Sequence, residues 1–376
     1  MTPVETQAPL STGFRPTVAE IDLEAVRHNV RVIKPSDAEV MAVVKANGYG
    51  HRAIPVARAA VEGGATWLGV ALVEEGLALR GAGIEAPILV LTEFPPGSER
   101  EAIGARLTPT VYSSRAIRSL ADAAPSGTGV HVKVDTGMHR VGIPPEQAPA
   151  LVDEASRAGL SIEGIWTHFA LAEEPGNATT LRQLELFLEV CATLEDGGIR
   201  PRYRHAANSG ATIASPETHL DLVRVGAALY GIAPGPQLEG ALDLRPAMTL
   251  RSAVTHAKRV PSGHGISYGH LHRTTVETTI ATIPIGYADG YLRSLSNHGR
   301  VLIRGRRYPV VGSVTMDQLM VDVGDDALEV GDDVVLFGRQ GDAEIRVEEV
   351  AAWAGTIGYE IVCAVSERVP RHVTVS

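Results

Sequence analysis

Between residues 40 and 231 the chain alternates between two kinds of segment. Short apolar runs rich in β-branched residues are each followed by a longer stretch rich in Ala, Leu, Glu and Arg with helical spacing of its apolar positions. This alternation predicts β-strands followed by helices, as in α/β proteins with a parallel sheet. The predicted strands are 40–46, 67–72, 87–92, 107–113, 130–136, 162–169, 203–209 and 222–230, and the predicted helices include 51–62, 73–82, 115–123, 146–158 and 180–194.

The number and spacing of these strands favour a closed barrel. Eight strands can be counted, and their starts are about 26 residues apart on average, close to the roughly 30 residues per unit of a (β/α)8 barrel. An open doubly wound sheet is the alternative, because the same alternation serves both folds. That fold is expected to carry a glycine-rich dinucleotide turn after its first strand, whereas residues 45–50 read KANGYG. We therefore predict an α/β fold with a (β/α)8 TIM-type barrel over residues 17–240.

The pattern changes after about residue 240. Val, Thr and Ile then alternate with polar residues and glycine-containing turns recur, which is typical of β-strands. Residues 241–376 are therefore predicted to form a C-terminal, mainly β domain. The early segment 17–23, TVAEIDL, alternates in the same way, so we expect it to pair with that domain. The clearest alternating segments of the domain are 249–260, 276–284, 299–304, 308–311 and 333–337.

The N-terminal residues 1–16 lack a basic start followed by an apolar stretch, so they predict a flexible tail and not a signal peptide. The longest apolar runs, such as 67–73, are far too short to span a membrane. We therefore expect a cytoplasmic protein without a membrane partner.

Composition narrows the function. The 376 residues carry a formal net charge of −10, which argues against a nucleic acid as partner, because phosphate backbones need a basic surface. Two cysteines far apart, Cys191 and Cys363, argue against a disulfide framework and a cysteine metal site. No HExxH or Walker-type motif is present, so a metal hydrolase has no support and no metal is predicted.

Lys45 ends the first of the predicted barrel strands. The C-terminal ends of barrel strands face the active site. A lysine partly removed from water there has a lowered pKa and a nucleophilic amine, as a Schiff-base lysine requires. An ordinary lysine whose ammonium group reaches solvent would give the same local pattern, so this residue alone does not decide the function.

The surroundings of Lys45 resemble the cofactor-lysine motif of the alanine racemase family. The segment 42–51 reads AVVKANGYGH, and the resemblance continues in order over nearly everything from Thr17 onward. It implies a fold-type III pyridoxal 5'-phosphate enzyme that interconverts L-alanine and D-alanine by a two-base mechanism and supplies D-alanine for peptidoglycan synthesis. The other matching segments are KVDTGMHRVG at 133–142, HAANS at 205–209, RVGAALYG at 224–231, GISYG at 265–269, PIGYADGY at 284–291, TMDQ at 315–318 and GYE at 358–360.

The resemblance also implies how the cofactor is held. Lys45 would bear it, and small residues with backbone N–H groups after a strand suit its phosphate. Without the resemblance, Ser209 and Gly226 would be interpreted as ordinary turn or strand-end residues. The cofactor-binding residues implied are Lys45, Tyr49, His168, Ser209, Arg224, Gly226, Ala227 and Tyr359, with Asn208 in support.

Arg224 is the most informative of these residues. The resemblance places it against the pyridine nitrogen of the cofactor. An arginine offers only donors, so that nitrogen should stay unprotonated and withdraw electrons less strongly than a protonated one. This favours simple proton removal and return over decarboxylation, for which an acid is expected at this position.

Racemisation needs an acid/base group on each face of the substrate carbon. By resemblance Lys45 serves one face and Tyr268 the other, with His168 as the partner of that tyrosine. His205 would continue the hydrogen-bond chain through Arg224. Because Tyr268 lies in the β domain, the resemblance implies a homodimer in which the partner subunit contributes it to each active site.

The resemblance places the substrate carboxylate on Arg140, whose planar fork of donors suits it. Lys133 would support that arginine, as a carbamate in many family members. Met316 and Tyr287 would narrow the substrate entrance, and Asp317 would support them.

Three alternatives stay open. A racemase of the same family could act mainly on serine or on a broader set, because one methylene contributes only about 1–3 kcal/mol of discrimination. A decarboxylase on the same scaffold is disfavoured by Arg224. A non-catalytic pyridoxal-phosphate-binding barrel is disfavoured by Tyr268 and its full second domain.

Overall fold

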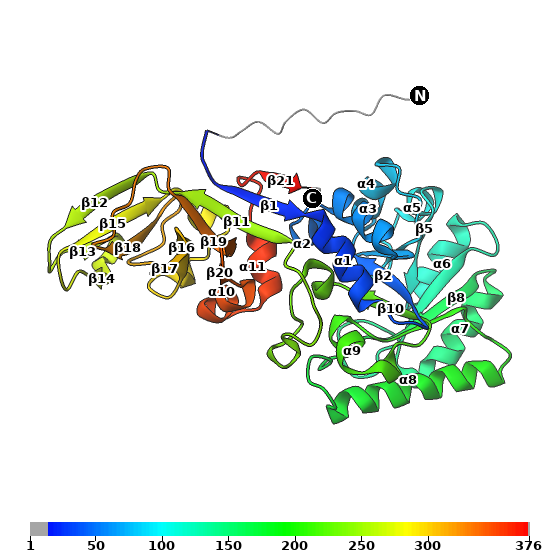
Figure 1. Cartoon of the computed structure of the whole chain (residues 1–376). Coiled ribbons are helices and arrows are strands. Elements are labelled where there is room, and N and C mark those ends of the chain that lie inside the picture. Colours follow the sequence, from blue (N-terminus) through cyan, green and yellow to red (C-terminus); the bar gives the residue numbers. More distant parts are fainter. Residues whose placement is uncertain (1–13, 375–376) are drawn as a thin grey trace. The chain divides into compact units, whose positions relative to one another are not determined.

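The computed structural model describes residues 14–374, and the chain divides into two compact units (Figure 1). One unit is Glu24–Arg245, and the other combines Met1–Leu23 with Pro246–Ser376. The predicted N-terminal tail, 1–16, lies outside the described residues apart from residues 14–16.

The unit Glu24–Arg245 contains parallel strands with helices between them (Figure 1). Each strand is short, and strands such as Trp67–Val70 and Ile88–Val90 are wholly apolar and buried, because both of their faces are covered. The strands are β2 (Glu39–Val43), β3 (Trp67–Val70), β4 (Ile88–Val90), β5 (Leu107–Thr108), β6 (Thr110–Val111), β7 (Gly129–Lys133), β8 (Ser161–Trp166), β9 (Tyr203–His205) and β10 (Leu222–Val225).

These strands form the predicted barrel. They pair in the orders β10-β2-β3-β4-β5 and β6-β7-β8-β9, parallel throughout. Strands β5 and β6 are the halves of one predicted strand, divided at Pro109, which has no N–H to donate to a ladder. Between β9 and β10, the N–H of Asp221 donates to the carbonyl of Arg204 at 3.1 Å and that of Arg224 to the carbonyl of Ala207 at 3.0 Å. The (β/α)8 barrel is thus confirmed.

The interior of the barrel is a packed core. Met41, Trp67, Leu89, Tyr203 and Leu222 form one buried cluster contributed by five different strands. Side chains from alternate strands filling the interior in this way are typical of the fold, so that ligands bind at the strand ends and not through the centre.

The helices of this unit include several that the pattern did not predict. The predicted strands 203–209 and 222–230 end early, at His205 and Val225, and short helices follow them. Asn208 causes the first of these changes, because its side chain accepts from the N–H of Ala211 and so caps a helix. The helices are α1 (Leu23–Ile33), α2 (Lys45–Tyr49), α3 (Ala53–Gly63), α4 (Val73–Gly81), α5 (Glu99–Gly104), α6 (Ser114–Ala123), α7 (Ala148–Arg157), α8 (Ala178–Asp196) and α9 (Ser209–Ala214), with a 3-10 helix at Ala227–Tyr230.

The second unit is rich in β-structure, as predicted. Its main sheet has the order β17-β16-β19-β11-β1-β21, and a smaller sheet has the order β12-β15-β18. The strands are β1 (Val18–Asp22), β11 (Met248–Ala253), β12 (His256–Val260), β13 (Gly265–Ile266), β14 (His272–Arg273), β15 (Thr278–Ile283), β16 (Arg300–Ile303), β17 (Arg306–Pro309), β18 (Leu319–Gly324), β19 (Asp333–Gln340), β20 (Ala343–Ile345) and β21 (Arg371–Thr374).

Two features of this unit depend on distant parts of the chain. Strand β1, from the N-terminal segment, lies between β11, to which it is antiparallel, and β21, to which it is parallel. Two helices, α10 (Val347–Ala354) and α11 (Gly358–Ala364), precede β21 and were not predicted. Within residues 14–374, every helix is too short or too polar to span a bilayer.

Candidate active site

Lys45 follows strand β2 and opens a turn with an unusual backbone. Residues 46–49 have φ values of 51°, 52°, 64° and 51°. Each L-residue other than glycine in this left-handed region costs roughly 1–2 kcal/mol. Such strain persists only where the surroundings fix it, and it gathers at functional sites.

Two side chains hold this turn. The Glu75 carboxylate accepts from the N–H of Ala46 at 2.6 Å, and its other oxygen accepts from that of Ala71 at 2.8 Å. The Asn47 side-chain carbonyl accepts from the N–H of Ala53 at 3.0 Å. Lys45 is thereby held, half-buried, at the C-terminal end of its strand.

A small cradle lies beside this turn. The Ser209 hydroxyl accepts from the N–H of Gly226 at 2.9 Å. A Cβ on Gly226 would lie 2.7 Å from the Tyr49 hydroxyl, so only glycine leaves this space open. The Tyr49 ring stacks on Tyr230 with ring centroids 4.9 Å apart. Hydroxyls and strand-end N–H groups around a space that a side chain would fill are the donors that a phosphate takes, so these residues fit the phosphate of pyridoxal phosphate.

Arg224 is buried at the end of β10 and is held by neutral acceptors. Its guanidinium donates to the carbonyls of Thr167 at 2.7 Å and Ala206 at 2.9 Å. It also lies 3.1 Å from Nδ1 of His168 and 3.2 Å from Nδ1 of His205. Burial lowers the pKa of Arg224 to about 9, so the group still carries its proton at neutral pH.

The two histidines are neutral acceptors. Burial, followed by nearby positive charge, lowers the pKa of His168 well below its usual range. Burial does the same for His205, with smaller contributions from its charged and histidine neighbours. Because Arg224 can only donate, both rings accept at Nδ1, and the proton of each lies on Nε2.

Lys133 and Trp166 adjoin this cluster at the ends of β7 and β8. The Lys133 Nζ lies 4.2 Å from the centre of the Trp166 ring, and the Arg224 Cζ lies 4.7 Å from the centre of the same ring. Burial, and then the charges of Arg224 and Arg140, lower the pKa of Lys133 to about 7. At neutral pH a large fraction of this amine is therefore uncharged and nucleophilic.

Arg140 lies on an exposed loop after β7. The Asp135 carboxylate accepts from the N–H groups of Gly137, Met138 and His139, each at 3.0 Å, and so shapes the loop that leads to it. Within residues 14–374 the Arg140 guanidinium has no ion pair.

The remaining predicted residues lie in the other unit. Tyr268, Met316 and Tyr287 are 77 %, 53 % and 42 % exposed, which is unusual for such large side chains. The Ser313 hydroxyl donates to the carbonyl of Tyr268 at 2.9 Å, and the N–H of Tyr287 donates to the carbonyl of Thr315 at 3.0 Å. Three adjoining loops thus present these residues. We call Tyr268, Tyr287 and Met316 the three-loop surface.

Two further predicted residues belong to this unit. Asp317 accepts from the Arg368 guanidinium at 2.7 Å. Tyr359 lies half-buried at the start of α11.

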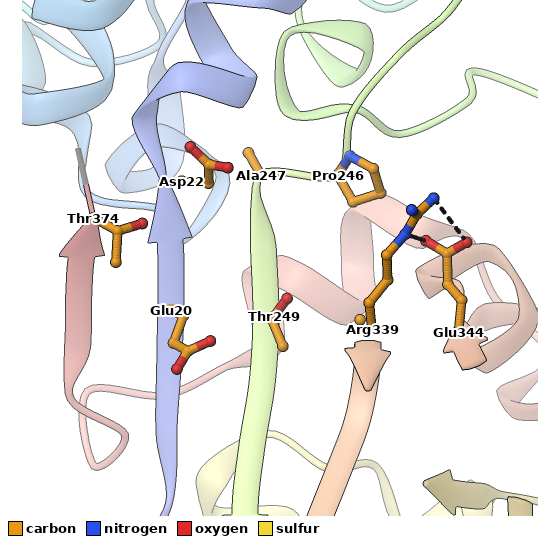
Figure 2. A pocket seen from close by; sticks show the side chains of 9 residues that line it. Glu20, Asp22, Pro246, Ala247, Thr249, Arg339, Glu344 and Thr374 are labelled. Atoms are coloured by element: carbon orange, nitrogen blue, oxygen red, sulfur yellow. Dashed lines mark hydrogen bonds and ion pairs between the residues drawn. The ribbon is translucent and has the colours of Figure 1, made fainter. Parts of the chain in front are cut away.

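A cavity of about 270 Å³ in this same unit is not the predicted site (Figure 2). Carboxylates gather at its rim, where Arg339 pairs with Glu344 at 3.1 Å. None of the predicted site residues lines it. The lining residues are Glu20, Asp22, Pro246, Ala247, Thr249, Gly338, Arg339, Glu344 and Thr374. No group of three or more His, Cys, Asp or Glu side chains in residues 14–374 is placed to bind a metal ion.

Sequence reasoning missed three residues of the barrel site. Glu75 holds the Lys45 turn, Trp166 lies against both buried cations, and His131 lies 2.9 Å from His205. His131 had a readable signal, because it is two residues before Lys133 in a strand and so shares its face. Glu75 had only the signal of a helix start, where it accepts from the N–H groups of Ala71 and Leu72, because its contact with the distant Ala46 leaves no local pattern.

Comparisons with known proteins agree with this architecture. Residues 21–234 match the family model described as alanine racemase, N-terminal domain, and residues 247–373 match the C-terminal domain model. The alanine racemase of Symbiobacterium thermophilum is 50 % identical over 366 residues, which cover 96 % of this chain and 97 % of that protein. That of Streptomyces coelicolor is 46 % identical, with 94 % of each chain covered.

Solved structures of alanine racemases are also similar to this chain in fold and in sequence. The crystal structure of alanine racemase from D-cycloserine-producing Streptomyces lavendulae has a TM-score of 0.92 and 43 % identity, and covers 96 % of this chain and 98 % of that one. The alanine racemase of Bacillus anthracis with bound L-Ala-P has a TM-score of 0.89 and 41 % identity, with coverage of 96 % and 95 %.

The fold and these matches define the class of the protein as an amino-acid isomerase built from a barrel and a β-rich unit. The chain belongs to the alanine racemase family, which depends on pyridoxal 5'-phosphate.

Proposed function

We propose that this protein interconverts L-alanine and D-alanine with pyridoxal 5'-phosphate as its cofactor. The relatives named above are alanine racemases over nearly their whole length. The observation that carries the proposal is the buried Arg224, held by neutral acceptors near the cradle formed by Ser209, Tyr49 and Gly226.

The residues that would hold the cofactor are those of the barrel site. Lys45 would bind it covalently, and Ser209, Tyr49 and the backbone at Gly226 and Ala227 would bind its phosphate, with Tyr359 in addition. When bound, pyridoxal phosphate withdraws electrons from the substrate carbon and makes its proton acidic.

Arg224 would set the strength of this effect. Its guanidinium keeps its proton and offers only donors toward the ring nitrogen, which therefore stays unprotonated. Electron withdrawal is then weaker, which favours removal and return of a proton over loss of the carboxylate.

Two bases would move the proton. The Lys45 amine takes a proton from, or returns it to, one face of the substrate carbon, and the Tyr268 hydroxyl serves the other face. His168 carries its own proton on Nε2, so this N–H can donate to the tyrosine oxygen and stabilise it when ionised.

The substrate carboxylate would bind to the Arg140 guanidinium. Lys133, with its pKa near 7, offers an uncharged amine that reacts with dissolved CO2 to give a carbamate. That new carboxylate would pair with Arg140 and fix its fork of donors. Met316 and Tyr287, supported by Asp317, would narrow the entrance.

The active enzyme would be a homodimer in which one chain supplies Lys45 and its partner supplies Tyr268. The three-loop surface supports this arrangement, because large side chains gathered in the open mark interaction sites.

The test is D-enantiomer formation from a panel of L-amino acids that includes alanine and serine, measured by chiral chromatography. We expect alanine to have the highest kcat/KM. A higher kcat/KM for serine, or no racemisation by the cofactor-loaded protein, would contradict the proposal.

A further inference from the structure

His131 extends the hydrogen-bond chain from Arg224 into the floor of the barrel. The ring is wholly buried on β7, and its Nδ1 lies 2.9 Å from Nε2 of His205. The other nitrogen of His205 faces Arg224 at 3.2 Å. Three side chains from three strands thus form one continuous chain.

The protons on this chain have only one consistent arrangement. Arg224 can only donate, so Nδ1 of His205 accepts and its proton lies on Nε2. That N–H then needs an acceptor, and Nδ1 of His131 is the atom within reach. Burial, and then the charge of Arg224, lower the pKa of His131 to about 3, so this ring is neutral and can accept.

The surroundings of His131 are built to keep the ring in place. A Cβ on Gly164, in the neighbouring strand, would lie 2.4 Å from its Nδ1, so glycine is what leaves room for it. Trp67 and Tyr203 pack on it, with ring centroids 5.3 and 6.1 Å away. Among the described residues its Nε2 has no hydrogen-bond partner, and the Glu163 carboxylate lies 3.9 Å from it. Burying a polar ring with one nitrogen that makes no hydrogen bond costs free energy. The hydrogen bond that Nδ1 accepts from His205 therefore explains why a histidine lies at this place in the core.

We infer that His131 is a positioning residue that fixes the tautomer of His205 and, through it, the position of the Arg224 guanidinium. The inference rests on the role proposed above for Arg224. An apolar residue in place of His131 would leave the His205 Nε2–H without an acceptor. Moving that proton to Nδ1 would remove the unpaired N–H at Nε2. The new Nδ1–H would then face an N–H of the Arg224 guanidinium, and two donors would be in contact.

Two matched variants separate this role from simple packing. Asparagine keeps an acceptor near the place of Nδ1, and leucine has the same branched side-chain skeleton without one. His131→Asn and His131→Leu therefore both replace the ring with a side chain branched at Cγ, and only the second removes the acceptor.

The primary measurement is the tautomer of His205 in the full-length protein purified with its cofactor. Nitrogen-15 NMR of histidine-labelled protein distinguishes protonated from unprotonated ring nitrogens, and His205→Gln identifies the resonance. We expect the proton on Nε2 in the wild type and in His131→Asn, and a shift of population to Nδ1 in His131→Leu.

The secondary measurements are the cofactor absorbance spectrum and racemisation. We expect kcat/KM to fall about tenfold in His131→Leu and less than about threefold in His131→Asn, with an altered spectrum in the first only. An unchanged His205 tautomer in His131→Leu, or equal losses in both variants, would overturn the inference. A shifted tautomer with unchanged racemisation would instead support it and contradict the role proposed for Arg224.

Discussion

The barrel half of the candidate site and the three-loop surface differ in almost every physical property. Arg224, His205 and Lys133 are buried, hydrogen-bonded or packed on an aromatic ring, and have strongly lowered pKa values. Tyr268, by contrast, is 77 % exposed. One half is organised completely within a single chain, whereas the other half is presented outward.

This difference indicates how the protonation states of the two sets of residues are determined. Burial sets protonation states, because it favours the neutral forms of His and Lys. Burial acts on the protonation state of an exposed tyrosine only when another surface covers it. We therefore predict that the cofactor binds without the three-loop surface and that this surface becomes reactive only on assembly.

The largest effect is expected when the barrel half loses Lys45. In Lys45→Ala we expect racemisation to fall by about 10⁴-fold or more, with loss of the cofactor absorbance band, because one group both holds the cofactor and moves the proton. Chiral chromatography and absorbance spectroscopy measure the two effects. The exposed Lys34→Ala is the matched control and should retain both. Retained racemisation in Lys45→Ala would refute the assignment.

Loss of Tyr268 tests the other half. Tyr268→Phe should lower racemisation by about 10²–10⁴-fold, the usual contribution of a positioned acid/base group, while the cofactor band persists. Mixing this protein with Lys45→Ala should restore about a quarter of the wild-type activity, because half of the randomly exchanged dimers are mixed and each has one intact site. No recovery after proven subunit exchange would exclude bases from different chains.

A pH change through neutrality alters the charge of Lys133. Its pKa is lowered to about 7, so the reactive uncharged amine increases as the pH rises through that value. From pH 6 to pH 8 the uncharged fraction increases about tenfold. Carbon-13 NMR with labelled bicarbonate should show a carbamate signal that grows over this range and is absent in Lys133→Ala. A signal that falls with rising pH would contradict the assignment.

The smallest effect on activity is expected from Arg15, whose partner Asp289 contacts the backbone next to the three-loop surface. Arg15 donates twice to the wholly buried Asp289, each time at 2.8 Å, and this carboxylate also accepts from the N–H of Gly286, just before Tyr287. Arg15→Ala should destabilise the protein by about 1–3 kcal/mol and lower kcat/KM only about twofold, because Arg368 still lies 3.4 Å from the carboxylate.

Thermal unfolding checks this expectation. The exposed pair between Arg31 and Glu24 provides the control, since Arg31→Ala should change stability by less than about 0.5 kcal/mol. Equal effects of the two substitutions would show that the pair between Arg15 and Asp289 stabilises the protein no more than an exposed ion pair does.

The sequence predicted the barrel well, because apolar runs such as 40–44 are buried on both faces and differ clearly from exposed segments. It extended the strands ending at His205 and Val225 too far, since the helices after them depend on a cap and a backbone turn and not on hydrophobic spacing. The site depends on contacts that local pattern does not encode. The ion pair between Arg15 and Asp289 joins residues that lie 274 positions apart.

Strand β1 leaves the ribosome long before either of its neighbours in the sheet, β11 and β21, has been made. Synthesis of the intervening chain, from Asp22 to Met248, takes on the order of 10–45 s at typical elongation rates. During that time the nascent barrel can fold while β1 waits with both edges unpaired. The β-rich unit therefore cannot be completed until β21 has been made, and a fragment of residues 247–373 expressed alone would lack an internal strand of its main sheet.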